Sequence, residues 1–167
     1  QQIPVFLDTN VGSQVVNAGK SRVWGIETDT TVLLSRNDRF TATVNYLNAE
    51  LTAFQTSLLG LTGSINDSDP STPGNQPFDL SGNRPVQSPK WTIALGYDHD
   101  FHIGDHKITA SVFSRFKSDY YLQPFNNRAE LQEAFTQTDL SLEYSAPGNK
   151  LSVQAYVRNL ENYRPYS

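Results

Sequence analysis

Cysteine and methionine are both absent from the 167 residues of this chain. Without cysteine there are no disulfide bonds, no thiolate metal sites and no cysteine nucleophile. No apolar run approaches the roughly 18 residues of a membrane-spanning helix, although a membrane-spanning strand leaves a much weaker signal. The chain opens on Gln1 and Gln2 with no signal peptide, and we expect it to be a piece of a larger protein.

Charge is also scarce, at 18% of residues, and the 13 basic and 17 acidic side chains leave a net charge of −4. This balance argues against a nucleic-acid partner, because proteins that bind nucleic acids normally carry a basic face. The hydrophobic fraction is only 37%, yet 9 Phe, 8 Tyr and 2 Trp are too many for a disordered chain. The length allows about one folded domain.

Apolar and polar residues alternate along most of the chain, as in strands whose two faces meet different surroundings. The clearest run puts Trp91, Ile93 and Leu95 on one face and Thr92, Ala94 and Gly96 on the other. In the next run only Phe113 breaks the alternation. The pattern predicts an all-β, antiparallel up-and-down meander with strands at 2–7, 20–35, 40–54, 89–102, 106–122, 134–146 and 150–162.

The expected strands are long, and the connections between them alternate in length. Several strands exceed the usual five or six residues more than twofold. Short turns at 35–39, 102–105 and 146–149 alternate with long connections near 8–19, 55–88 and 123–133. In a meander this gathers all short turns at one end, an asymmetry typical of bacterial outer-membrane barrels.

Aromatic residues mark both ends of the expected strands. Trp24 and Trp91 lie toward the long connections, and Phe40 and Phe101 lie toward the short turns. The stretch from Trp91 to Phe101 spans roughly 33 Å of strand. At a tilt of about 40° it rises roughly 25 Å, the height of the apolar band of a membrane barrel. These four residues would form the girdles at the membrane interfaces. A soluble β-sandwich would explain the alternation but not the girdles.

Three stretches resemble the C-terminal barrel region of TonB-dependent outer-membrane receptors. The first covers residues 17–27 and ends in Trp24-Gly25-Ile26-Glu27. The second combines Leu80-Ser81-Gly82-Asn83 with Pro89-Lys90-Trp91 and Gly96-Tyr97. The third is Val157-Arg158-Asn159-Leu160. Together they span most of the chain in the order that the family shows.

The resemblance implies a barrel of 22 strands closed around a plug. Residues 1–167 would supply about seven of these strands, without the plug domain and the last strand. It further implies active import of a scarce ligand, most often a ferric siderophore, energised through TonB, in the outer membrane of a Gram-negative bacterium. The partners would be membrane lipid, the receptor's own plug, TonB and the small-molecule ligand. A soluble all-β ligand-binding module and a passive porin-like channel remain as alternatives.

No enzyme or cofactor is indicated, because neither a nucleophile set nor a phosphate-binding glycine loop stands out. The richest cluster of potential metal ligands is 98–106, which contains all three histidines. Period-two alternation would put His99 on the apolar face and Asp98 and Asp100 on the other. We therefore expect a polar hairpin end there and no metal site.

Two sets of polar residues are candidates for function. On the polar face, expected to line the lumen, are Glu27, Lys117, Asp139 and Arg158, with Lys117 opposite or near Asp139 and Arg158 diagonal to it. They would either contact a plug or ligand or simply keep the lumen hydrated. The long connection 55–88 would either gate the ligand or form an idle surface, and its candidate ligand-binding residues are Asp67, Asp69, Asp79 and Arg84.

Overall fold

The computed structural model describes residues 2–6, 13–17, 19–56 and 78–166. The chain divides into two compact units. One unit contains Gln1–Trp24, Leu47–Ser88 and Tyr120–Gln132; the other contains Gly25–Tyr46, Pro89–Asp119 and Glu133–Ser167. Within the described residues, no helix has the length and apolar character needed to cross a membrane.

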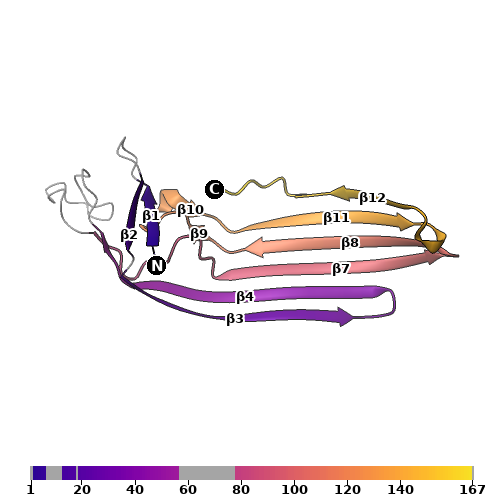
Figure 1. Cartoon of the computed structure of the whole chain (residues 1–167), viewed down its shortest axis with the longest axis horizontal. Helices are drawn as coiled ribbons and strands as arrows, with labels where there is room; N and C mark the ends of the chain where they lie inside the picture. The colour runs from indigo at the N-terminus through magenta and orange to yellow at the C-terminus, as the bar shows by residue number, and fades with distance from the viewer. Residues whose placement is uncertain (1, 7–12, 18, 57–77, 167) are drawn as a thin grey trace. The chain divides into compact units, whose positions relative to one another are not determined.

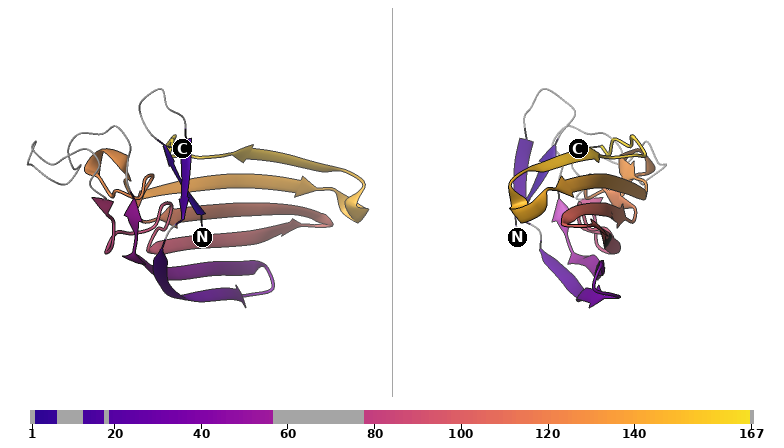
Figure 2. Two further views of the ribbon diagram at one scale, coloured as in Figure 1. Left: turned by 60° about the vertical axis from the view of Figure 1, so that its left-hand side comes forward. Right: turned by 90° about the vertical axis from the view of Figure 1, so that its right-hand side faces the viewer.

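Six long strands form one antiparallel sheet (Figure 1), in the order β12-β11-β8-β7-β4-β3. They are β3 (Lys20–Leu33), β4 (Asp38–Ala53), β7 (Trp91–Ile103), β8 (His106–Lys117), β11 (Phe135–Ser145) and β12 (Ser152–Val157). Each long strand pairs with the long strands that precede and follow it in the chain. Two further views show the strands side by side (Figure 2). The predicted up-and-down meander is confirmed.

The register gives this sheet one apolar and one polar face. Tyr97 pairs with Val112, Val112 with Leu140, and Leu140 with Val157, so one apolar row crosses four strands. Because side chains alternate along a strand, the adjacent row through Asp98, Ser111 and Ser141 faces the other way. The apolar face stays open, with exposed fractions between 36% and 56% for Leu95, Tyr97, Phe101, Leu140, Leu142, Val153 and Val157.

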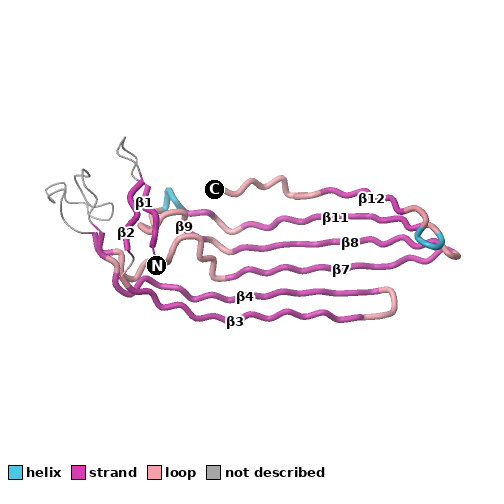
Figure 3. The backbone as a smooth tube through the Cα atoms, viewed as in Figure 1, coloured by secondary structure: helices cyan, strands magenta, loops and turns pink. Residues whose placement is uncertain are grey.

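Three short connections join these strands at one end of the sheet, as predicted (Figure 3). After β3, the Leu34 N–H donates to the Asp38 carbonyl at 3.0 Å, and the Asn37 N–H donates to the Ser35 hydroxyl at 3.0 Å. Gly104, at φ 58°, turns β7 into β8. The third turn holds the 3-10 turn η2 (Pro147–Asn149), with Gly148 at φ 66°. Glycine tolerates this left-handed backbone at no steric cost.

The long connections contain short paired strands. β1 (Gln2–Phe6) pairs with β2 (Ser13–Asn17), β5 (Gln55–Thr56) with β6 (Phe78–Asp79), and β9 (Tyr120–Tyr121) with β10 (Leu131–Gln132), which follows the 3-10 turn η1 (Arg128–Glu130). The strand predicted at 2–7 is therefore present but outside the large sheet, so six of the seven predicted strands share one sheet. The second strand of its hairpin, at 13–17, was predicted as connection.

A small core lies in the first unit. Leu51, near the end of β4, and Phe54, just after it, are each 1% exposed, and Leu80 is 2% exposed. The Leu51 N–H donates to the Asn83 carbonyl at 2.9 Å, and the Gly82 N–H donates to the Leu51 carbonyl at 2.7 Å. The stretch 80–83 that carried part of the family resemblance is thus a turn that closes on the end of β4.

The last strand is shorter than predicted. β12 ends at Val157, whereas the alternation suggested a strand over 150–162. Asn159 and Asn162 have φ values of 54° and 50°, a left-handed conformation that asparagine tolerates better than most residues. The Asn159 side chain also bonds the Tyr163 backbone, donating to its carbonyl at 3.0 Å and accepting from its N–H at 3.1 Å. These bonds stabilise a turn where a ladder would otherwise continue.

Truncating Leu80 should therefore destabilise the protein. Leu80→Ala leaves a cavity in a packed site and should lower the free energy of unfolding by about 2–5 kcal/mol. Denaturant unfolding of the purified protein measures this loss. Thr52→Ala, at an exposed position one residue after Leu51, is the matched control and should change the free energy by less than about 0.5 kcal/mol. Equal losses in both variants would contradict a core at Leu80.

Candidate functional site

The polar face of the sheet carries ion pairs that run across neighbouring strands. Arg39 on β4 contacts Asp98 on β7, with 2.7 Å between Nη2 and Oδ2. Arg115 on β8 contacts Asp139 on β11 at 3.0 Å. Exposed cross-strand pairs of this kind contribute only modestly to stability, about 0.2–1 kcal/mol each. They make the face polar and charged and add little to its stability.

Phe113 lies on this polar face, which explains why it breaks the alternation. The register places it between Gly96 on β7 and Asp139 on β11, and its side chain is 40% exposed. A Cβ atom added to Gly96 would lie 3.4 Å from the Phe113 ring and would clash with the Thr41 hydroxyl. Glycine at position 96 therefore provides the space that the Phe113 ring and Thr41 occupy.

Two arginines accompany aromatic rings here. The Arg115 guanidinium carbon lies 5.5 Å from the centre of the Phe113 ring, and that of Arg158 lies 4.9 Å from the Tyr156 ring. A hollow of about 190 Å³ is lined by Phe113, Asp139, Tyr156 and Arg158 together with their neighbours. We call Phe113, Arg115, Asp139, Tyr156 and Arg158 the arginine–aromatic patch.

The patch combines two guanidinium groups with one carboxylate, so its formal charge is positive. A guanidinium presents planar donors that match carboxylate-like anions, and it stacks on aromatic faces. Exposed aromatic rings add surface for flat or apolar groups. The patch can therefore hold an anionic, oxygen-rich molecule of moderate size by several weak contacts, without covalent chemistry.

The structure changes the predicted pairing of the lumen candidates. Lys117 pairs with Phe135, and Asp139 pairs with Phe113, so Lys117 is not the partner of Asp139. Lys117 lies four residues along β8 from Phe113, the partner of Asp139, and Arg115 forms the ion pair with Asp139 instead. Arg158 follows Val157, which pairs with Leu140, so Arg158 comes level with Asp139 and not diagonal to it. Glu27, on β3, is exposed and lies outside the patch.

The candidates in the long connection also separate. Asp67 and Asp69 lie outside the described residues. The Asp79 carboxylate accepts a bond from the Ser81 N–H at 2.9 Å, and bonds from the Ser81 hydroxyl and N–H hold the pKa of Asp79 below its ordinary value. Asp79 thus shapes a turn. The Arg84 guanidinium lies over the Tyr121 ring at 4.8 Å, within the first unit.

The histidine-rich segment is divided between the two faces of its hairpin. Asp98 pairs with Arg39, and Asp100 lies 3.7 Å from the Lys107 ammonium. His99 and its partner Asp38 lie on the opposite, apolar face, where they contact each other. Among the described residues, no three potential ligands come close enough to hold a metal ion.

The proposed girdle residues lie on strands of the sheet, and Trp91 and Phe40 have aromatic neighbours. The Trp91 ring packs 4.8 Å from the Tyr46 ring, and the register places Phe40 opposite Tyr97. Phe101 is 49% exposed and Trp24, on β3, is 52% exposed. Whether they meet a membrane interface stays a prediction.

Comparison with known proteins agrees with the fold. The family model described as TonB dependent receptor-like, beta-barrel, matches residues 2–160. The chain belongs to this family. A TonB-dependent receptor barrel also accounts for the open apolar face of the sheet, since such barrels present apolar side chains outward. No curated protein matches the chain.

Two solved structures of siderophore receptors share the fold of this TonB-dependent receptor chain. PiuA from Acinetobacter baumannii aligns with a TM-score of 0.67 and 18% identity, over 92% of this chain and 19% of PiuA. BauA, the ferric preacinetobactin receptor of the same organism, aligns with a TM-score of 0.64 and 22% identity, over 98% of this chain and 22% of BauA. The chain thus spans about a fifth of the length of each receptor.

A double-mutant cycle tests the close approach around Gly96. Gly96→Ala should lower the unfolding free energy of the receptor. Inside a strand alanine is normally more stabilising than glycine, so a loss here would come from the close contacts of this position. Combining it with Thr41→Ala removes the clashing hydroxyl and should recover most of the loss, with a coupling energy of about 0.5–3 kcal/mol. Denaturant unfolding of the four proteins measures the cycle. Strictly additive effects would show that the two side chains do not compete for this space.

Proposed function

We propose that this chain forms part of the barrel wall of a receptor that imports a ferric siderophore across the outer membrane of a Gram-negative bacterium, with energy delivered through TonB. Membership of the TonB-dependent receptor family supports the receptor role, and the two structural neighbours are siderophore receptors by name. The plug domain and the TonB-binding segment would belong to other parts of the same receptor.

The arginine–aromatic patch is the observation that carries the siderophore assignment on this chain. In the proposed barrel the polar face lines the lumen, so the patch would lie along the route of the ligand. Ferric siderophores bind iron through oxygen donors and commonly carry negative charge. Positive guanidinium groups on aromatic rings would attract such a ligand through charge and stacking. Several weak contacts suit a transport route, because the ligand must leave the patch again to move onward.

The apolar face supports the membrane assignment against the soluble alternative. Leucine and valine side chains of β7, β11 and β12 are exposed on this face. A soluble module would have to cover such a surface, because large exposed apolar patches promote association. In the proposed receptor lipid covers it.

An arginine introduced on either face distinguishes lipid from lumen. Leu95→Arg places a charge in the middle of the apolar face and should cost about 2–4 kcal/mol of barrel stability. Ala94→Arg, the next residue on the same strand, points to the polar face and should cost far less. Reversible unfolding of both variants of the full receptor in lipid vesicles measures the difference. A larger cost for Ala94→Arg would reverse the assignment of the faces.

Removing the charge of the patch should slow uptake without preventing assembly. The double variant Arg115→Gln with Arg158→Gln should lower uptake of radioactive ferric siderophore by about tenfold, equivalent to about 1.4 kcal/mol. Lys107→Gln, which removes a cation from another pair of the same face, is the matched control and should retain uptake. Heat-modifiable gel migration confirms folding of each variant.

Arg115→Lys separates charge from shape, because lysine keeps the charge but loses the planar stacking on Phe113. We expect an intermediate uptake rate for this variant. Uptake by the double glutamine variant at the rate of the unmodified receptor would place the ligand route elsewhere on the barrel.

A further inference from the structure

A hydrogen-bonded cluster interrupts the apolar face near the short turns. Asp38, the first residue of β4, pairs with His99 of β7 in the register. Its carboxylate accepts bonds from the Tyr97 hydroxyl at 2.5 Å, from the His99 Nδ1 at 2.6 Å and from the Ser35 hydroxyl. The side chains of His99 and Asp38 are 30% and 21% exposed. A carboxylate on an otherwise apolar face is costly unless it is bonded in this way.

Asp38 also fixes the orientation of the His99 ring. A carboxylate bonded to Nδ1 of a histidine sets the position of the proton and leaves Nε2 for another partner. The Phe101 ring packs edge-on against the imidazole, with 4.3 Å between the ring centres. No residue in the described part of the chain bonds to Nε2 of His99. The histidine is therefore oriented, with one nitrogen available.

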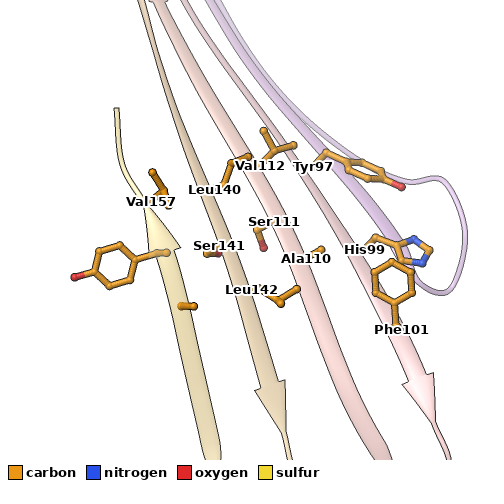
Figure 4. Close-up of a pocket in the computed structure, with 12 residues that line it drawn as sticks. Tyr97, His99, Phe101, Ala110, Ser111, Val112, Leu140, Ser141, Leu142 and Val157 are labelled. Atoms are coloured by element: carbon orange, nitrogen blue, oxygen red, sulfur yellow. The ribbon is translucent and has the colours of Figure 1, made fainter. Parts of the chain in front are cut away.

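An apolar groove of about 760 Å³ begins at this histidine and crosses β8, β11 and β12 (Figure 4). The residues opposite His99 along its row are Ala110, Leu142 and Ala155. The two alanines are short, so they leave a hollow between bulkier neighbours. Tyr97, Val112, Leu140 and Val157 form the adjacent row of its lining. Figure 4 shows His99 and Phe101 at one side of this groove and Val157 at the other.

We propose that this groove binds one phospholipid, with an acyl chain in the groove and the lipid phosphate at Nε2 of His99. With Nδ1–H donated to Asp38, a protonated imidazole donates its second N–H to a phosphate oxygen, a short charge-assisted bond. The second N–H of the imidazolium is the donor that selects a phosphate oxygen, and the apolar lining selects the chain. The inference rests on the proposed function, because the receptor's membrane supplies the lipid at this face, on the side of the short turns.

Lipid titration of the full receptor in detergent, followed by native mass spectrometry, tests the site. The probes are phosphatidylethanolamine and a diacylglycerol with the same acyl chains, which lacks the phosphate. The unmodified receptor should retain one phosphatidylethanolamine at least tenfold more tightly than diacylglycerol. His99→Gln should abolish this preference. His106→Gln should keep it, because His106 bonds to Tyr144 and lies outside the groove lining.

Filling the groove tests the position of the acyl chain. Ala110→Leu should weaken binding of both lipids, by about tenfold or more. Ala42→Leu, on the same face but outside the groove, is the control and should leave binding unchanged. Ala155→Leu provides a second groove variant if Ala110→Leu fails to show heat-modifiable migration. Unchanged lipid binding in the folded groove variants, or an intact phosphate preference in His99→Gln, would overturn the proposal.

Siderophore binding to the same preparations separates this inference from the proposed function. A receptor that binds ferric siderophore but shows no preferred phospholipid would contradict the lipid site alone. A receptor that retains the phospholipid but binds no siderophore would contradict the proposed ligand and support the groove.

Discussion

Every long strand of this chain must keep its apolar side chains on one face, and the antiparallel register is the constraint that ensures it. A slip of one residue between β7 and β8 would move Leu95 and Val112 to opposite faces of the sheet. The short turns hold that register, since only two residues separate Ile103 from its partner His106. Glycine at a left-handed position makes so short a connection possible. The arginine–aromatic patch and the apolar groove both depend on this register, because it places their residues opposite one another on neighbouring strands.

Two departures from alternation coincide with places where the sheet carries distinctive chemistry. Phe113 lies among polar groups and packs beside Gly96, which leaves its ring exposed next to Arg115. Asp38 lies among apolar groups and is bonded by Tyr97 and His99. In both places a residue of the wrong polarity for its face is tolerated because a specific neighbour compensates. Exceptions of this kind are where functional groups are expected in a locally consistent chain.

The long connections depend on a different kind of stabilisation. Leu51, Phe54 and Leu80 are buried in the first unit, and Gln132 beside β9 is fully buried. The backbone bonds of Leu51 to Asn83 and Gly82 attach the turn at 80–83 to the strand end. This turn belongs to one of the stretches that resembled the receptor family, and its packing gives a structural reason for leucine and glycine there. Outside the sheet, the family signature is a turn and its core contacts.

The sequence by itself determined the fold class, the places of the six strands that form the sheet, their apolar and polar faces and the three short turns, because alternation and turn residues act over a few neighbouring positions. It also indicated the receptor family from short stretches in order. Only the tertiary structure decided that Arg115 and not Lys117 pairs with Asp139, that residues 2–6 pair with 13–17, and that β12 ends at Val157. Pairings between strands distant in the sequence depend on register, and register is set by the packing of all strands together.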